Sequence, residues 1–586
     1  MAASRGSLAY NSSRMNLFAD ESTLLTLKIV AISSILTVIF GLLALLFPHA
    51  GKDFVHRLEQ KLSRFAERKI AVVLVLFFAV IALRLLLLPL LPVPVPGIHD
   101  EFSYLLMADT FAHGRLANPP HPMWISFETF HVNWFPKYAS MYPPAQGFAL
   151  ALGQILGHPW IGVMLSDAAM CAAILWMLQG WFPARWALLG GVLAALKFGI
   201  ASNWMNSYWG GAAAAIGGAL VLGALPRIAK RAKARDAILL GLGVAILANS
   251  RPYEGFLFCV PAGAWFLWWL IGKAKSRQPL RVRLQNVLAP LALVLVLTAG
   301  FMGYYNWRLT GNPLLLPHVL NTRTYHTTGL FLWDHKKPEM HYRNQQFEDF
   351  YNDWERANYN NTWADVGRVS AEKLGRFAVT YFWVGELLLL PAVPFLFHDR
   401  KMRLLILTLL LVTVGVFAVI WSNAHYAAPL TCVIFALMVQ AIRHLRTMRI
   451  GFRPVGLALS RAVVLLLALD TVLYVSFRMC GPLPWTCQGD PSRAVIAEKL
   501  QHTPGKHLIL VRYEKDNHNI HDEWVYNGAE IDNAKVLWAR ELDPQQNANL
   551  FAYFKDRKIW LVIPDSDNIY LEPYTPPGAE LDSNDE

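Results

Sequence analysis

Two adjacent carboxylates, Asp100 and Glu101, stand where a strongly apolar stretch ends in the proline-rich letters VPVPGIHDEFSY. Ionisable side chains beside a membrane mark candidate functional sites. Neighbouring side chains point in different directions, so two useful carboxylates would have different roles. One could accept a proton from an acceptor hydroxyl while the other positions a ligand or a metal. The structural alternative is that both cap a helix beginning near Phe102, because carboxylates favour helix N-termini.

The segment after this pair mixes aromatic and polar side chains. His131, Lys137 and Tyr138 are its candidate substrate-binding residues. Such a mixture suits an interfacial helix that also lines a cleft, and it suits equally well an aromatic belt that only anchors the loop.

Further candidates lie at the ends of three other apolar segments: Asn206, Tyr208, Arg251, His425 and Tyr426. Arginine is permanently charged and donates bidentate hydrogen bonds, so Arg251 is a candidate phosphate ligand. An ion pair with Glu254 or interfacial snorkelling is the alternative. His425 could act as a base or ligand, or be a hydrogen-bonded structural histidine. The sequence contains no P-loop, HExxH or CxxC pattern, which argues against an NTPase, a zinc protease or a redox site.

Composition places most of the chain in a membrane. Of 586 residues, 55% are hydrophobic and only 16% are charged, whereas soluble proteins are about 25% charged. The apolar runs predict about 12 or 13 membrane segments and exclude a soluble enzyme. The stretch 144–181 is long for one span and is broken near Gly157. Either one helix crosses with a partial segment beside it, or the second half is re-entrant.

The net charge of +12 is distributed unevenly. Short basic loops indicate the cytoplasmic side, and they occupy 52–69, 227–235, 273–283, 400–403 and 443–453. Counting crossings places the loops 92–143 and 308–376 and the acidic tail on the other side. The sequence therefore predicts a multi-pass inner (plasma) membrane protein with an extracytoplasmic C-terminal domain. The charge follows topology, and no nucleic-acid partner is expected.

The expected division is a transmembrane domain over 1–477 and a tail domain over 478–586. Alternating apolar runs in the tail predict a small α/β layer, with strands near 507–513, 534–539 and 558–563 and a helix near 544–555. On the outer side, Cys480 and Cys487 in CGPLPWTC are candidates for a disulfide, with two free thiols as the alternative.

The DE pair in the first outer loop, the YPP letters at 142–144, the many spans and the large outer loop together resemble the GT-C superfamily of integral-membrane glycosyltransferases. The most similar members are bacterial relatives of the protein O-mannosyltransferases and of the aminoarabinose transferase acting on lipid A. The resemblance is most specific over 98–144, and the chain differs from it in His99 before the pair and Phe102 after it. The expected fold is an all-α, GT-C-like polytopic membrane protein with the small α/β tail.

The resemblance implies transfer of a sugar from a polyprenyl phosphate to a hydroxyl of a glycan, lipid or protein on the outer face. Asp100 matches the general base and Glu101 its acidic neighbour. Arg251 is assigned to the phosphate on topology alone. Because phosphate is a good leaving group, one base and one cation favour a single inverting displacement. Membrane lipids are expected partners, and the need for a divalent metal is left open.

Two other functions compete with this one. A transporter or flippase of lipid-linked or soluble solutes would use the outer carboxylates and Arg251 as binding groups, although no inverted-repeat pattern of broken helices is visible. A membrane scaffold that displays the tail is the third alternative.

Overall fold

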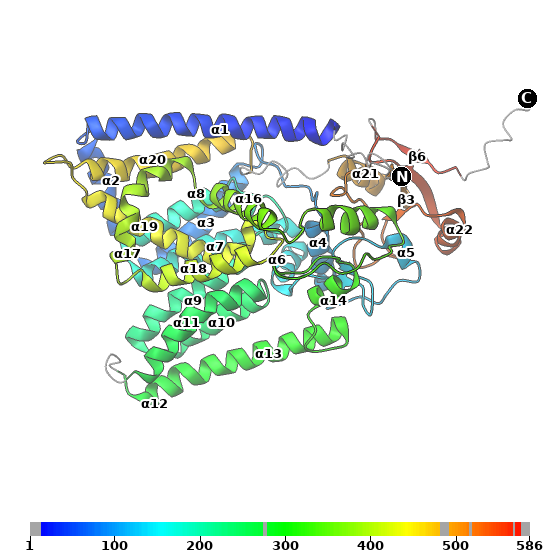
Figure 1. The fold of residues 1–586 in the computed structure, drawn as a ribbon, viewed down its shortest axis with the longest axis horizontal. Coiled ribbons are helices and arrows are strands. Elements are labelled where there is room, and N and C mark those ends of the chain that lie inside the picture. Colours follow the sequence, from blue (N-terminus) through cyan, green and yellow to red (C-terminus); the bar gives the residue numbers. More distant parts are fainter. Residues whose placement is uncertain (1–12, 273–277, 481–490, 515–517, 567–568, 576–586) are drawn as a thin grey trace, which may run out of the picture.

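A computed structural model describes residues 13–272, 278–480, 491–514, 518–566 and 569–575. Within these residues, eight helices are long and apolar enough to cross a membrane. They are the apolar part of α1 (Ser13–Leu46), α3 (Lys69–Leu86), α7 (Pro159–Trp181), α9 (Ala212–Arg231), α11 (Pro252–Ile271), the continuous segment from α12 (Leu280–Arg283) through η1 (Leu284–Leu288) to α13 (Ala289–Thr310), the segment from η4 (Ala424–Leu430) to α19 (Thr431–Thr447), and α20 (Val455–Ser476). The predicted polytopic helical fold is confirmed (Figure 1).

The predicted 12 or 13 segments exceed this number because several are shorter or bent. The helices α8 (Ala184–Phe198), α10 (Ala234–Ala248) and α18 (Arg403–Ala418) have 15 or 16 residues, a length of about 23 Å at 1.5 Å per residue. The apolar stretch 377–397 is divided between the end of α16 (Trp363–Tyr381) and, after a 97° bend, η3 (Val384–Ala392) and α17 (Val393–His398). Counting that bent pair as one span gives up to nine.

The ambiguous stretch 144–181 is divided between two helices. The first, α6 (Pro144–Ile155), has 12 residues, and the second, α7, has span length. Gly157 stands between them with φ of 119°, a backbone conformation open to glycine. The structure thus matches one crossing helix with a partial segment beside it.

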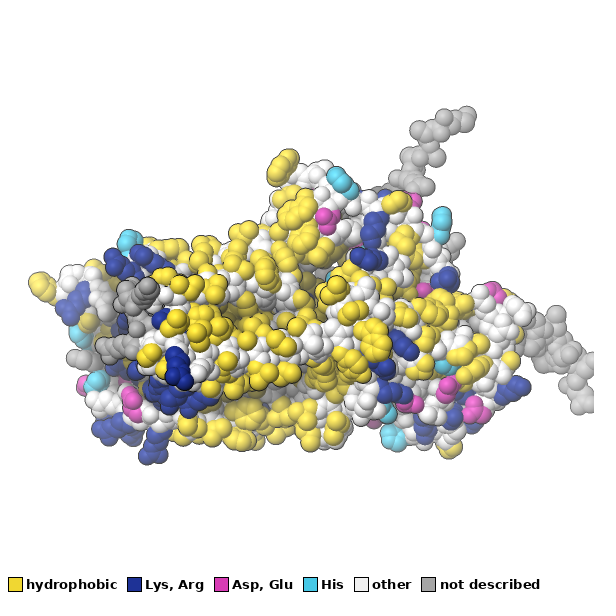
Figure 2. Space-filling model, turned by 90° about the horizontal axis from the view of Figure 1, so that it is seen from below, with side chains coloured by type: hydrophobic (Ala, Val, Ile, Leu, Met, Phe, Trp, Pro, Cys, Tyr) yellow, Lys and Arg dark blue, Asp and Glu magenta, His cyan; other side chains and the backbone are white. Residues whose placement is uncertain are grey.

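The predicted basic loops lie at one end of the helical bundle. There α2 (Lys52–Ala66) is joined to α19 and α20 by Glu59, which pairs with Arg446 at 2.7 Å and Arg461 at 3.4 Å. Lys and Arg side chains gather at this end, and hydrophobic side chains cover the middle (Figure 2).

The opposite end carries the tail and the two loops predicted to be outer, which are called the first and second outer loops below (Figure 1). The first loop forms α4 (His99–Ala112), α5 (Trp124–Phe127) and the short strands β1 (Val132–Asn133) and β2 (Ala139–Ser140). The second forms α14 (Pro317–Thr324), α15 (Gln345–Phe347) and η2 (Glu348–Glu355), and it ends where α16 begins, earlier than predicted.

The tail has the predicted α/β character. Its sheet has the order β4-β3-β5-β6, in which β3 pairs in parallel with β4 and β5 and β6 is antiparallel. The elements are α21 (Pro491–His502), β3 (Lys506–Val511), β4 (Val536–Arg540), α22 (Pro544–Tyr553), β5 (Arg557–Val562) and β6 (Leu571–Pro573). The three predicted strands and the helix are confirmed, and the short β6 was not foreseen.

The tail shares a hydrophobic core with the first outer loop. Phe102 and Trp134 of the loop are buried together with Leu508, Tyr526 and Phe554 of the tail. The predicted boundary at 478 therefore separates chain segments that pack as one body. The predicted disulfide cannot be placed, because Cys487 lies outside the described residues.

Candidate active site

Glu101 caps the helix that carries the site. Its Oε2 accepts hydrogen bonds from the backbone N–H groups of Gly97 at 2.9 Å and Ile98 at 3.3 Å, and Oε1 accepts one from Tyr208 at 2.9 Å. The bond from Ile98, the residue before α4, is the one that a capping box makes, and the bond from Tyr208 ties the start of α4 to a second loop. Burial raises the pKa of Glu101 to about 7. Backbone N–H groups bind both carboxylate oxygens of Glu101. Glu101 therefore has the helix-capping role that was the structural alternative for the carboxylate pair.

Asp100 faces side chains instead. Its Oδ1 lies 2.9 Å from His131 Nδ1 and also accepts a hydrogen bond from the Tyr142 hydroxyl. Within the described ranges Oδ2 has no hydrogen-bond partner. Burial alone would raise the pKa of Asp100, but the hydrogen bonds from His131 and from the Tyr142 hydroxyl outweigh it and hold the pKa well below the usual range. Asp100 is therefore an ionised acceptor.

Three chain segments bring aromatic and charged groups around Asp100. The Tyr104 and Tyr142 rings stack with centroids 4.5 Å apart. The guanidinium of Arg251, at the start of α11, lies 4.0 Å from the centre of the Tyr426 ring. Arg251 acts electrostatically on both stacked tyrosines, and no ion pair joins it to Glu254 in the described part of the chain.

The short helix η4 contributes His425 and Tyr426. His425 packs 4.4 Å from the Trp209 ring and acts electrostatically on Asp100. A Cβ atom on Gly211 would lie 2.6 Å from Ala428 Cβ. This close approach holds η4 against the start of α9.

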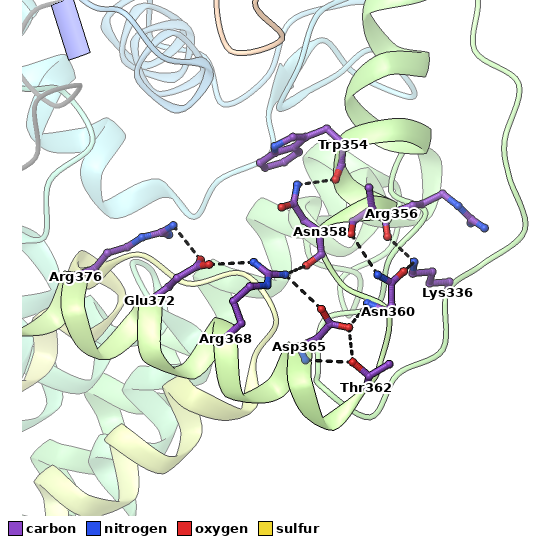
Figure 3. A network of polar contacts seen from close by, with 11 residues as sticks. Lys336, Trp354, Arg356, Asn358, Asn360, Thr362, Asp365, Arg368, Glu372 and Arg376 are labelled. Carbon is purple, nitrogen blue, oxygen red and sulfur yellow. Dashed lines mark hydrogen bonds and ion pairs between the residues drawn. The ribbon is translucent and has the colours of Figure 1, made fainter. Parts of the chain in front are cut away.

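The second outer loop holds η4 from the other side, through a polar network along α16 (Figure 3). Glu372 pairs with Arg368 at 2.9 Å and with Arg376 at 3.6 Å. Arg376 in turn donates a hydrogen bond of 3.4 Å to Asn423, immediately before η4. The loop and η4 are thereby tied through one helix.

Four predicted site residues lie elsewhere. Asn206 accepts a hydrogen bond from Arg84 at 2.8 Å, and the Tyr208 hydroxyl donates one to Pro94 at 2.9 Å, so both hold the loop that supports Glu101. The Tyr138 hydroxyl donates a bond of 3.0 Å to Asn527 of the tail. The side chain of Lys137 makes no polar contact within the described residues.

Several residues of the site were not predicted. Tyr142 is the first residue of the YPP letters, which supported the family resemblance but were given no role in the site. Tyr104 lies one helical turn after Asp100. His318 on α14 gave no sequence signal, because it comes from a distant loop. Burial, together with electrostatic interactions that include the charge of Arg251, lowers its pKa to about 4. Across the described ranges, no group of three or more His, Cys, Asp or Glu side chains is arranged to hold a metal ion.

No family model and no curated protein matches the chain. Solved structures do. The structure of ArnT from Cupriavidus metallidurans in the apo state is 14% identical with a TM-score of 0.46, over 84% of this chain and 93% of that one. The same protein bound to undecaprenyl phosphate is 15% identical with a TM-score of 0.42, over 85% and 92%.

An oligosaccharyltransferase from Archaeoglobus fulgidus, tethered with an acceptor peptide, is 11% identical with a TM-score of 0.41, over 84% of this chain and 68% of that one.

Proposed function

We propose that this protein is a membrane glycosyltransferase that moves a sugar from a polyprenyl phosphate to an acceptor hydroxyl. The observation that carries the proposal is that an ionised carboxylate, Asp100, and an arginine, Arg251, act electrostatically on the same two tyrosines, Tyr104 and Tyr426. These two charges are what a displacement at a sugar phosphate requires.

The proposed reaction is a single displacement. The acceptor oxygen forms a bond to the anomeric carbon, and its proton passes to the base that Asp100 provides. The bond from that carbon to the phosphate oxygen breaks, and its electron pair stays on the phosphate. Arg251 stabilises the departing charge through charge-assisted hydrogen bonds. Attack from the face opposite the phosphate inverts the anomeric carbon. Glu101 supports this arrangement by fixing the start of α4.

The test is transfer from a panel of radiolabelled polyprenyl-phosphate sugars into the lipid, glycan and protein fractions of the membrane. Asp100→Asn keeps the shape of the side chain and removes its charge, and it should lower transfer by about 10²-fold or more. Asp532→Asn, an exposed position, is the matched control. Full activity in Asp100→Asn would eliminate the Asp100 group as the base.

Arg251 is tested by binding of undecaprenyl phosphate alone. Arg251→Ala should weaken this binding by about 10-fold or more, since a hydrogen bond to a charged group contributes about 1.5–3 kcal/mol. Arg185→Ala, at the opposite end of the bundle, should bind normally. Unaltered affinity in Arg251→Ala would contradict the phosphate assignment. A transporter or flippase would bind the lipid without transferring sugar.

A further inference from the structure

We propose that Nε2 of His131 accepts the proton in this site, and that Asp100 acts through His131 by fixing the orientation of its imidazole ring. This inference rests on the proposed glycosyl transfer. It changes the identity of the base from the carboxylate that the sequence suggests to the imidazole beside it.

The hydrogen-bond geometry fixes the tautomer of His131. An ionised carboxylate only accepts hydrogen bonds, so the contact of 2.9 Å between Asp100 Oδ1 and His131 Nδ1 favours the proton on Nδ1. The Tyr142 hydroxyl donates its own proton to Asp100 and lies 3.2 Å from Nδ1, where its oxygen can accept the same N–H. A neutral imidazole has one ring proton, and Nε2 then carries a lone pair. Nε2 has no hydrogen-bond partner in the described part of the chain. The same logic of carboxylate, imidazole and reacting hydroxyl operates in hydrolytic triads.

The backbone of His131 is held in an unusual conformation. Its φ is +59°, in the left-handed region that few residues other than glycine adopt. Its carbonyl accepts hydrogen bonds from Ser103 Oγ at 2.7 Å and from the Met141 N–H at 3.2 Å. Ser103 lies on α4 one turn after Asp100, so the helix that carries the carboxylate also fixes the imidazole. Such conformations persist where surrounding contacts enforce them, and they cluster at functional sites.

Several titratable groups face His131 from neighbouring elements. Besides Asp100 and Tyr142, they are the histidines His99, His318 and His521. Burial lowers the pKa of all three, to about 4 for His318 and His521, so they are neutral near pH 7. His99 is also held by the Tyr526 hydroxyl at 2.9 Å and the Ile520 carbonyl at 3.2 Å. Asp100 is then the one ionised neighbour in direct contact.

Asp100 itself is a poor acceptor, because its pKa is held well below the usual range by the hydrogen bonds from His131 and Tyr142. In the proposed step, the acceptor O–H proton moves to His131 Nε2 as the oxygen bonds to the anomeric carbon. The electron pair of the broken carbon–oxygen bond leaves with the phosphate. The imidazolium that forms is stabilised by Asp100, and it later releases its proton to water.

The first test is His131→Asn. Asparagine tolerates the left-handed backbone and can donate to Asp100, but it is not a base. We expect kcat to fall about 10²-fold or more, with undecaprenyl phosphate binding unchanged. The dependence of transfer on pH should also differ from that of the wild type. His113→Asn, on the exposed end of α4, is the matched control. Activity within tenfold of wild type with an unchanged pH profile would overturn the proposal.

If His131→Asn does not fold, His131→Gly suits the same backbone and leaves space for added imidazole. Partial rescue of transfer by imidazole supports the proposal, and its absence in a folded protein that binds the lipid overturns it.

A second measurement does not depend on turnover. Diethyl pyrocarbonate modifies only unprotonated imidazole, so its rate at His131, followed by mass spectrometry against pH, reports protonation. In Asp100→Asn the midpoint should fall by about one pH unit or more, because a neighbouring carboxylate favours imidazolium. An unmoved midpoint refutes the pairing of the two residues. A wild type that shows the shift but transfers no sugar instead refutes the proposed function and leaves the pairing intact.

Discussion

At the scale of single residues, the adjacent carboxylates show what sequence can and cannot decide. Neighbouring side chains diverge, so different roles for Asp100 and Glu101 were predictable. Which residue caps the helix was not predictable, because the deciding partners are His131 and Tyr208, 30 and more positions away. Glu101 receives three backbone N–H groups, whereas Asp100 receives two side chains. Long-range contacts assign the roles.

The buried cap should make stability depend on pH. Because burial raises the pKa of Glu101 to about 7, the folded state holds a proton that the unfolded chain releases above about pH 4.5. The contribution of this group is therefore complete below that pH and is lost as pH rises through 7, by up to about 3 kcal/mol. Glu101→Gln should reduce the difference in thermal unfolding midpoint between pH 5 and pH 8.

Glu339→Gln is the control for this measurement, since Glu339 is 71% exposed. An equal pH dependence in wild type and Glu101→Gln would show that Glu101 keeps an ordinary pKa.

At the scale of elements, the loop that supports Glu101 depends on an arginine inside α3. Arg84 is fully buried and donates hydrogen bonds to the carbonyls of Leu91 at 2.7 Å and Pro92 at 3.1 Å and to Asn206 at 2.8 Å. Its guanidinium also lies 4.6 Å from the Trp160 ring. The apolar run around Arg84 predicted a span and concealed this role, because the groups it binds come from two loops.

Arg84→Met should therefore act on the site from a distance. It keeps an apolar stem and leaves two carbonyls and the Asn206 oxygen without their donor. We expect a loss of stability of about 3 kcal/mol or more and lower transfer, because the Asn206 loop also carries the Tyr208 N–H that holds Glu101. Thermal unfolding and transfer rates measure both effects. Arg235→Met, at an exposed position, is the control. Wild-type stability and transfer in Arg84→Met would show that Arg84 does not support the site.

Other elements were more predictable. The strands of the tail alternate with helical sequence, and both were located within a few residues. The bends between helices were harder to predict. Gly157 signalled the break before α7, whereas the bend between α16 and η3 lies before Gly385 and Glu386, in a segment whose apolar composition is also typical of a single span. Apolar composition reports contact with lipid or core, and it does not report backbone direction.

At the scale of the whole molecule, the tail and both outer loops meet in one buried junction. Arg540 of β4 pairs with Glu523 of the tail, donates a hydrogen bond of 2.6 Å to Gln346 of α15, and donates one of 3.3 Å to the Glu128 carbonyl of the first loop. The side chains of Arg540 and Glu523 are 3% and 0% exposed. The sequence predicted a tail on the outer side, but pattern alone could not show that one side chain joins three distant segments.

This junction predicts a specific non-additivity. Arg540→Met leaves Glu523 buried without its cation and should cost about 3–5 kcal/mol. Adding Glu523→Gln removes the uncompensated charge, so the double variant should be more stable than Arg540→Met alone. Transfer should follow stability, because the first loop and α15 frame the segment that carries His131. Chemical unfolding of the four proteins of the cycle, with limited proteolysis of the tail, measures this coupling. Additive losses would mean that the charges act separately, and that the tail is held to the outer loops by the shared apolar core around Phe102 and Trp134.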